Sequence, residues 1–128
     1  MAKLTFLKLE GLRGPSSAPR HIGDIEVWTD HYTFSRQPIN RAGPADPREF
    51  NHVLLQKSSD ESTLPLRLAY SKDQVFATGE LVIEELSERG QLLRTTAFRM
   101  RKIIIDKLDI LDYRVTLALK FEGMTVAR

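Results

Sequence analysis

Alternation of apolar and polar side chains near the C-terminus is the feature that most constrains the fold of this chain. The odd positions from 113 to 121 are all apolar, namely Tyr113, Val115, Leu117, Leu119 and Phe121. The positions between them are polar or charged, apart from Ala118. Successive side chains of a β-strand point to opposite faces of its sheet, so this spacing predicts a strand with one buried face. A shift of one residue would expose all five apolar side chains, so we expect a tightly fixed register.

Shorter apolar runs, separated by turn-forming residues, predict further strands along the chain. The expected strands are Lys3–Glu10, Asp24–Phe34, Phe50–Lys57, Gln74–Leu86 and Gln91–Asp106, with turns at Ser87–Gly90 and Lys107–Asp112. Only the segment 60–70 has the character of a helix. Six or seven strands with one helix favour a mainly β fold, an antiparallel β-barrel or sandwich of two sheets with one short flanking α-helix. The length suits a single domain, residues 1–128.

Two of these elements carry more detailed predictions. In the strand that ends at Asp106, the apolar positions change parity around Lys102, which predicts a β-bulge or a bend. In the helix, Ser62 or Asp60 is expected to cap the first free amides. The apolar side of that helix is predicted from Leu64, Leu68 and, as a further candidate, Leu66.

Composition and charge argue against several classes of partner. The chain has 19 basic and 17 acidic residues mixed along its length, so no basic surface for nucleic acid is expected. It has no cysteine, and therefore neither a disulfide framework nor a thiolate metal site. No apolar run approaches the roughly 20 residues that span a bilayer, so membrane insertion is not expected. No export signal is visible at the N-terminus, so any export needs another route.

The glycine-rich segment Gly11–Gly23 is the first candidate for a ligand site. Phosphate-binding loops direct backbone amides at a ligand from the start of a helix, and no helix follows here, so we expect a connecting loop. The residue types of a catalytic triad also occur in this region, as Ser16, Ser17, His21 and Asp24. No Gly-x-Ser-x-Gly nucleophile motif accompanies them, so we expect no enzyme.

Other groups of polar residues are also expected to be structural or solvent-facing, so the sequence predicts no metal and no cofactor. Neither the histidines nor the regularly spaced aspartates have the spacing of zinc or calcium ligands. Basic and apolar residues alternate between Phe98 and Lys102 and so face opposite ways, unlike a nucleic-acid stacking surface. The groups considered are His21, His31 and His52; Asp106, Asp109 and Asp112; and Glu84, Glu85 and Glu88.

Several short motifs resemble one family of secreted proteins. The segment "FLKLEGLRG", Phe6–Gly14, followed by "DIEVW", Asp24–Trp28, is similar to the start of the haemolysin-coregulated proteins, which form the tube of type VI secretion systems. The segment "VLLQKSSDESTLPL", Val53–Leu66, resembles the strand and Asp-x-Ser helix start of that family, although Thr63 stands where proline is common. The likeness continues through "GELVIEEL" and "TTAFRMRKIIIDKLDI" to the final strand.

The resemblance implies a structural protein without catalytic residues or cofactors. It implies a β-barrel with one flanking helix that assembles into homo-hexameric rings, and rings that stack into a hollow tube. The implied partners are secreted effector proteins and the spike and sheath components of the secretion machine. The implied location is cytoplasmic before assembly, followed by secretion through the machine without a signal peptide. The loop Ser35–Glu49 is the expected contact between subunits or stacked rings, with Pro38, Ile39, Asn40 and Arg41 as the interface residues, and a disordered surface loop is the alternative.

Two other functions stay open at this point. A small-ligand-binding β-barrel would line a cavity with inward side chains, although bulky residues such as Tyr113, Leu117 and Phe121 favour a filled interior. An enzyme is the third alternative. Solution size separates the first two hypotheses, because a ring has six times the mass of one 14.6 kDa chain.

Overall fold

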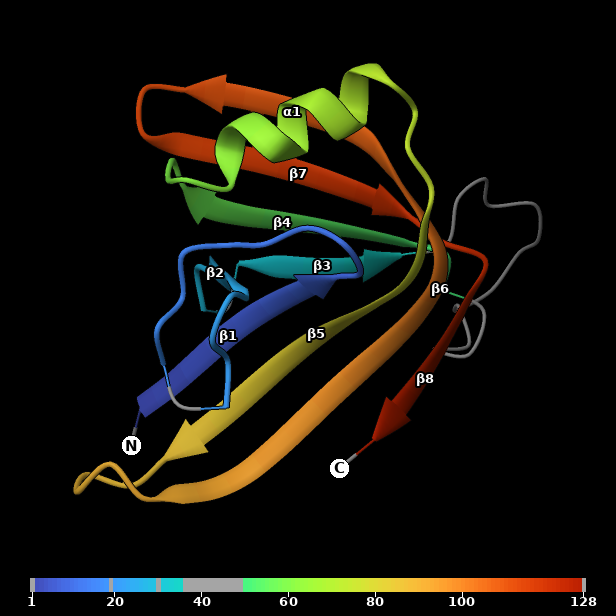
Figure 1. Cartoon of the computed structure of the whole chain (residues 1–128). Helices are drawn as coiled ribbons and strands as arrows, with labels where there is room; N and C mark the ends of the chain where they lie inside the picture. The colour runs from blue at the N-terminus through green and yellow to red at the C-terminus, as the bar shows by residue number, and fades with distance from the viewer. Residues whose placement is uncertain (1, 19, 30, 36–49, 128) are drawn as a thin grey trace.

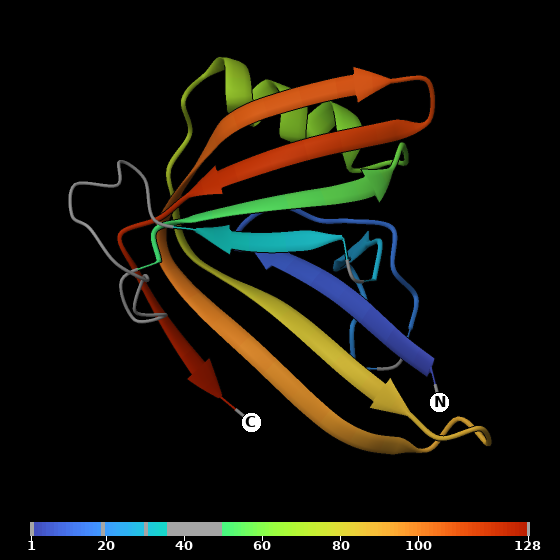
Figure 2. The same cartoon turned by 180° about the vertical axis from the view of Figure 1, so that it is seen from behind.

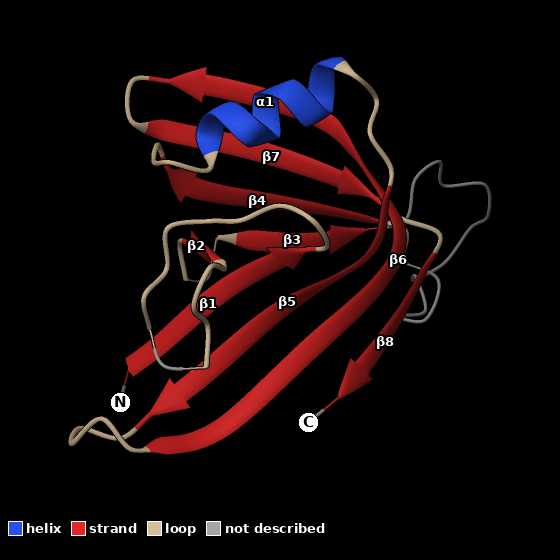
Figure 3. Ribbon diagram, in the orientation of Figure 1, coloured by secondary structure: helices blue, strands red, loops and turns tan. Residues whose placement is uncertain are grey.

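Antiparallel β-structure dominates the computed structural model, which describes residues 2–18, 20–29, 31–35 and 50–127. Within this part of the chain there are eight strands and one helix. Their bounds are β1 Ala2–Leu9, β2 Ile25–Val27, β3 Tyr32–Ser35, β4 His52–Ser58, α1 Thr63–Ser71, β5 Phe76–Leu86, β6 Leu92–Leu111, β7 Arg114–Lys120 and β8 Gly123–Ala127. The predicted mainly β class with one short helix is confirmed (Figure 3). The helix is not long and apolar enough to cross a bilayer.

The long strand β6 belongs to both halves of the sheet. The strand order is β2-β1-β5-β6-β7-β4-β3, and β8 pairs with β6 outside this path. The first half of β6 lies between β5 and β8, and its second half pairs with β7 (Figure 1). Lys102 takes a positive φ of 50° between these halves, and the register with β7 shifts between Ile105 and Lys107. The predicted change at Lys102 is therefore confirmed, and it lets one strand place apolar residues in a common core from both sheet halves.

The predicted strand Asp24–Phe34 is wrong as a single element. It is divided into β2, which pairs with β1, and β3, which pairs with β4. Between them, Trp28 donates its backbone N–H to the Gln56 carbonyl at 2.9 Å, and Gln56 donates to the His31 carbonyl at 3.1 Å. The sheet is not closed, and β2 and β3 lie at its two edges. The segment between them carries the chain from one edge to the other. Figure 2 shows β3, β4 and β7 side by side from behind.

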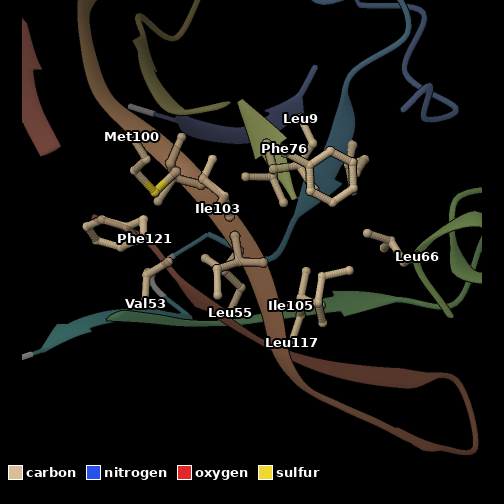
Figure 4. Close-up of a cluster of buried hydrophobic side chains, with 14 of the residues drawn as sticks. Leu9, Val53, Leu55, Leu66, Phe76, Met100, Ile103, Ile105, Leu117 and Phe121 are labelled. Carbon is tan, nitrogen blue, oxygen red and sulfur yellow. The ribbon is translucent and has the colours of Figure 1, made fainter. Parts of the chain in front are cut away.

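The interior is filled by large apolar side chains from both halves of the sheet. Alternate residues of β7, including Leu117 and Leu119, are fully buried, which confirms the predicted inward face of this strand. Phe76 and Ile103 meet them from β5 and β6 (Figure 4). At about 1.5–3 kcal/mol for each large apolar side chain, burial on this scale is the main stabilising term of the fold.

Two predictions near the C-terminus are wrong in detail, and one strand was not predicted. The segment 107–111 is the end of β6 rather than a turn, because its residues pair with β7. The turn is confined to Asp112 and Tyr113, and Tyr113 is consequently 68% exposed instead of buried. The strand β8 was not expected; it pairs with residues 97–101 of β6.

Helix α1 lies over the part of the fold formed by β6 and β7 (Figure 1). Ser62 occupies the predicted N-cap position, but its hydroxyl donates to the Asp60 carboxylate and makes no bond to a helix amide. Leu66 and Ala69 are buried against the sheet. The predicted apolar side is therefore confirmed for Leu66 and wrong for Leu64 and Leu68, which are 64% and 49% exposed.

Candidate functional site

The loop between β1 and β2 uses its backbone amides within the loop itself. Gly14 donates to the Gly23 carbonyl at 2.7 Å, and Gly23 donates to the Ser16 carbonyl at 2.8 Å. The backbone amide of Ser16 donates to the Asp24 backbone carbonyl at 3.1 Å. These bonds form a ladder across the loop and direct its amides at its own carbonyl groups. That arrangement is the one expected of a connecting loop rather than of a phosphate cradle.

A buried charged cluster holds this loop against β5. Arg20 Nε donates to Glu84 Oε2 at 3.0 Å, and His21 Nε2 lies 3.2 Å from the same oxygen. The contact between His21 Nε2 and Glu84 is close, but it does not have the geometry of a hydrogen bond. On the other side of the ring, His21 Nδ1 lies 3.0 Å from Asp24 Oδ2. Only 3% of the Glu84 side chain is exposed, so the expectation that it faces solvent is wrong.

The electrostatics of this cluster favour an ionised carboxylate. Burial alone would raise the pKa of Glu84, but the hydrogen bond and charge of Arg20, together with the nearby His21 ring, outweigh it and hold the pKa below its usual value. Both nitrogens of the His21 ring face carboxylate oxygens. The Ser16 hydroxyl accepts the amide of Ala18 at 3.2 Å. Because neither nitrogen faces a hydroxyl, the cluster lacks the nucleophile–base contact of a catalytic triad.

A second buried charge positions the start of α1. Lys57 is 1% exposed, and its ammonium donates to the Ser58 carbonyl at 2.8 Å and contacts Asp60 Oδ1 at 3.0 Å. Burial lowers the pKa of Lys57, while the hydrogen bond and charge of Asp60 oppose that change. Asp60 also accepts the amide of Ser62 at 2.8 Å. The lysine therefore fixes the turn that begins the helix.

The remaining predicted site residues are scattered or lie outside the described residues. The interface residues Pro38, Ile39, Asn40 and Arg41 belong to the segment 36–49, which the structure does not describe. The other two histidines have separate partners, since His52 Nε2 lies 3.6 Å from Asp106 and His31 Nδ1 lies 2.8 Å from the Thr29 carbonyl. In the part of the chain that the structure describes, no group of three or more histidine, aspartate or glutamate side chains is arranged to hold a metal ion.

Exposed apolar residues gather at the turn between β6 and β7, a segment named here the β6–β7 tip (Asp109–Tyr113). Ile110 is 42% exposed, Leu111 71% and Tyr113 68%. The Tyr113 ring lies 6.2 Å from the Trp28 ring, and the Arg114 guanidinium lies 5.7 Å from the same ring. The Tyr113 side chain of the tip is therefore held in place by its contact with the Trp28 ring.

A groove of about 410 Å³ separates α1 from the loop after β1, and we name it the α1 groove. Its lining comes from one side of the helix and from the loop, and it includes apolar residues and two cations. The lining residues are Gly11, Leu12, Arg13, Pro65, Leu68, Ala69, Lys72 and Gln74. A depression of about 440 Å³ on the opposite side of the helix is formed by Arg67, Tyr70 and the end of β6.

The sequence alone predicted neither the β6–β7 tip nor the α1 groove as a site. The outward position of Leu64 and Leu68 is set by which helix face meets the sheet, and periodicity alone does not give this. The tip had a visible signal, because "DILDY" places two aliphatic residues and one aromatic residue around Asp112. Its meaning was obscured by treating 107–112 as a solvated turn.

A broader depression of about 700 Å³ lies on the outer face of β1, β5 and β6. It is lined mainly by charged and hydroxyl side chains around Gly79, including Lys8, Arg99 and Arg101. Arg99 already contacts Glu80 at 3.6 Å. This depression is open to solvent and differs from the interior cavity that a ligand-binding barrel requires, because the interior is filled.

The fold is that of solved type VI secretion proteins. It superimposes with a TM-score of 0.77 on Hcp1 from Salmonella typhimurium, at 17% identity, covering 98% of this chain and 86% of that one. The secreted protein Hcp3 from Pseudomonas aeruginosa gives a TM-score of 0.72 at 10% identity, with coverage of 98% and 97%. A chain of the anti-feeding prophage baseplate gives 0.54 at 14% identity, with coverage of 98% and 91%.

The family itself is shown by the sequence. The model of the family described as "Type VI secretion system effector, Hcp" matches residues 6–127. Among curated proteins, none matches this sequence. The chain belongs to the Hcp family of type VI secretion proteins, as its motifs predicted, and this identity supports the role of a tube protein.

Proposed function

We propose that this chain is the structural subunit of a type VI secretion tube, which forms hexameric rings that stack and carry effectors. The observation that carries the proposal is the family match over residues 6–127, together with the shared fold. The filled interior and the exposed apolar tip also support a role in assembly rather than catalysis. The similarity to a chain of a phage-like baseplate agrees with a place in a contractile machine that includes a spike and a sheath.

Mass and shape in solution test this proposal. Purified protein is expected to elute near six times 14.6 kDa and to appear as rings by negative-stain electron microscopy. Rings that stack end to end at high protein concentration would support the formation of a tube. A protein that stays monomeric at millimolar concentration would contradict the proposal and favour the small-ligand-binding alternative.

We also propose that the loop residues Pro38, Ile39, Asn40 and Arg41 contribute to the contact between subunits or stacked rings. The variant carrying Ile39→Asp and Arg41→Asp places two carboxylates there and is expected to weaken rings or their stacking. If this variant assembles like the wild type, the loop is not at the interface. A control matched in charge changes Arg89→Asp and Gln91→Asp in the exposed turn between β5 and β6.

Export and cargo follow from the same proposal. The subunit is proposed to be cytoplasmic until the machine assembles, then to leave the cell through that machine with effector proteins bound to the ring. The test compares culture supernatants of cells with an active machine and cells whose sheath is deleted. Detection of the protein outside both strains to an equal extent would contradict export by the machine.

A further inference from the structure

We propose that the β6–β7 tip of one copy binds in the α1 groove of the next copy. This inference rests on the proposed function, because it names the contact that would join neighbouring subunits. The tip and the groove differ in shape and charge and would form a head-to-tail contact. Contacts of this type generate rings when the rotation between copies closes.

The tip has the character of a surface that becomes buried. The side chains of Leu111 and Tyr113 are 71% and 68% exposed. A two-residue turn needs neither of these large apolar side chains, since polar residues and glycine are the usual choices. Apolar residues clustered at a protruding turn mark contact sites more often than isolated exposed ones do.

The groove complements the tip in polarity and in charge. Its lining includes the apolar residues Leu12, Pro65 and Leu68 and the cationic residues Arg13 and Lys72. Neither cation has an ion pair with another described residue. The tip brings two carboxylates beside its apolar side chains. Asp109 already contacts Lys107 Nζ at 3.3 Å, whereas Asp112 has no cationic partner within the described part of the chain and is the carboxylate available to the groove. Opposite charges around an apolar contact fix its orientation.

One copy is not arranged to fill its own groove. The end of β6 approaches α1 on the side of Arg67 and Tyr70. The groove lies on the other side of the helix, where Pro65 and Lys72 face the loop after β1. Because the helix separates the two surfaces, the tip that fills the groove must come from a second copy.

Cysteine cross-linking tests this contact directly, since the chain has no native cysteine. Leu111→Cys protein is mixed with Leu68→Cys protein, and both sites are exposed in the free chain. A short bismaleimide is expected to give covalent dimers only in the mixture, and the double variant is expected to give a ladder that stops at the closed ring. Leu93→Cys, which is 56% exposed at the other hairpin, replaces Leu111→Cys as the matched control.

A charge-reversal variant provides a second readout. Arg13→Glu with Lys72→Glu is expected to lower the cross-linking yield about tenfold, because the lining of the groove would then repel the Asp112 carboxylate of the tip. Arg89→Glu is the control for a change of surface charge. Asp112 is left unchanged because its φ of 54° suits aspartate better than most residues.

The outcomes separate this inference from the proposed function. Rings without a tip-to-groove cross-link above the Leu93→Cys control would overturn the inference and leave the tube proposal standing. Cross-linked chains without rings would support the contact and contradict the hexameric tube. Absence of both would overturn both.

Discussion

The imidazole ring of His21 stacks on the phenyl ring of Phe6, with centroids 4.0 Å apart and planes inclined by 9°. Phe6 points to the outer face of β1, away from the main core, and is only 3% exposed because the loop covers it. The same histidine lies between the carboxylates of Asp24 and Glu84. One side chain therefore joins an apolar contact to an ionic cluster, and the loop after β1 is fixed to the sheet at this point.

Removal of this side chain is expected to destabilise the fold. His21→Ala leaves the buried carboxylates of Asp24 and Glu84 with fewer partners and uncovers Phe6, at a cost of about 2–4 kcal/mol in the free energy of unfolding. Urea denaturation followed by circular dichroism measures this difference. His31→Ala is the control, because His31 is exposed, and it should change the free energy by less than about 1 kcal/mol.

The pH dependence of stability should reveal the Glu84 carboxylate. Its folded pKa is held low by Arg20 and His21, below an unfolded value of about 4.3. The stabilisation is therefore fully present above that unfolded value and is lost as the pH falls through the folded pKa. Wild type should be more stable than Glu84→Gln at pH 6, and the difference should shrink below about pH 4. Glu88→Gln, at an exposed position, should show no such convergence.

Local alternation was sufficient to predict those strands that have one buried face. The buried residues Val115, Leu117 and Leu119 repeat every second position, so β7 is encoded in its own sequence. The change at Lys102 was visible for the same reason. The family was recognisable from short motifs, which the match over residues 6–127 confirms.

Other features depend on contacts between distant segments. Glu84 sits in a run of charged residues that predicts exposure, yet a loop some sixty positions earlier buries it through Arg20, at a sequence separation of 64. The strand β2 ends near Val27 because the chain leaves one edge of the sheet for another. The exposed face of α1 is likewise decided by the sheet beneath it, so neither the tip nor the groove was predicted as a site.

The buried ammonium of Lys57 should contribute less to stability than its contacts suggest. Removing the ammonium from water raises the free energy of the folded state, and the ion pair with Asp60 offsets only part of this desolvation free energy. Lys57→Met keeps most of the volume and should be within about 1 kcal/mol of wild type, or more stable. Asp60→Ala leaves the ammonium without its carboxylate and should lose about 3 kcal/mol. Thermal unfolding of both variants, with the exposed Glu61→Ala as control, gives the comparison.

That ordering has a clear contrary outcome. If Lys57→Met is several kcal/mol less stable than Asp60→Ala, the lysine contributes a net favourable interaction, and the Ser58 carbonyl is the partner that supplies it. The volume of the side chain is tested separately by Lys57→Ala, which opens a cavity and should cost more than Lys57→Met.

The loop ladder predicts different tolerances for two glycines. A Cβ on Gly14 would lie 2.5 Å from the Asp24 carbonyl oxygen and 2.8 Å from its carbon, both of them backbone atoms. Gly14→Ala should therefore force the loop away from the sheet and cost about 2–3 kcal/mol. At Gly123 the added carbon would meet the end of the Arg101 side chain, which can rotate away, so Gly123→Ala should cost less than about 1 kcal/mol. Hydrogen exchange of the loop amides, measured beside denaturation, should rise only in Gly14→Ala; equal effects would show that the loop is not packed as described.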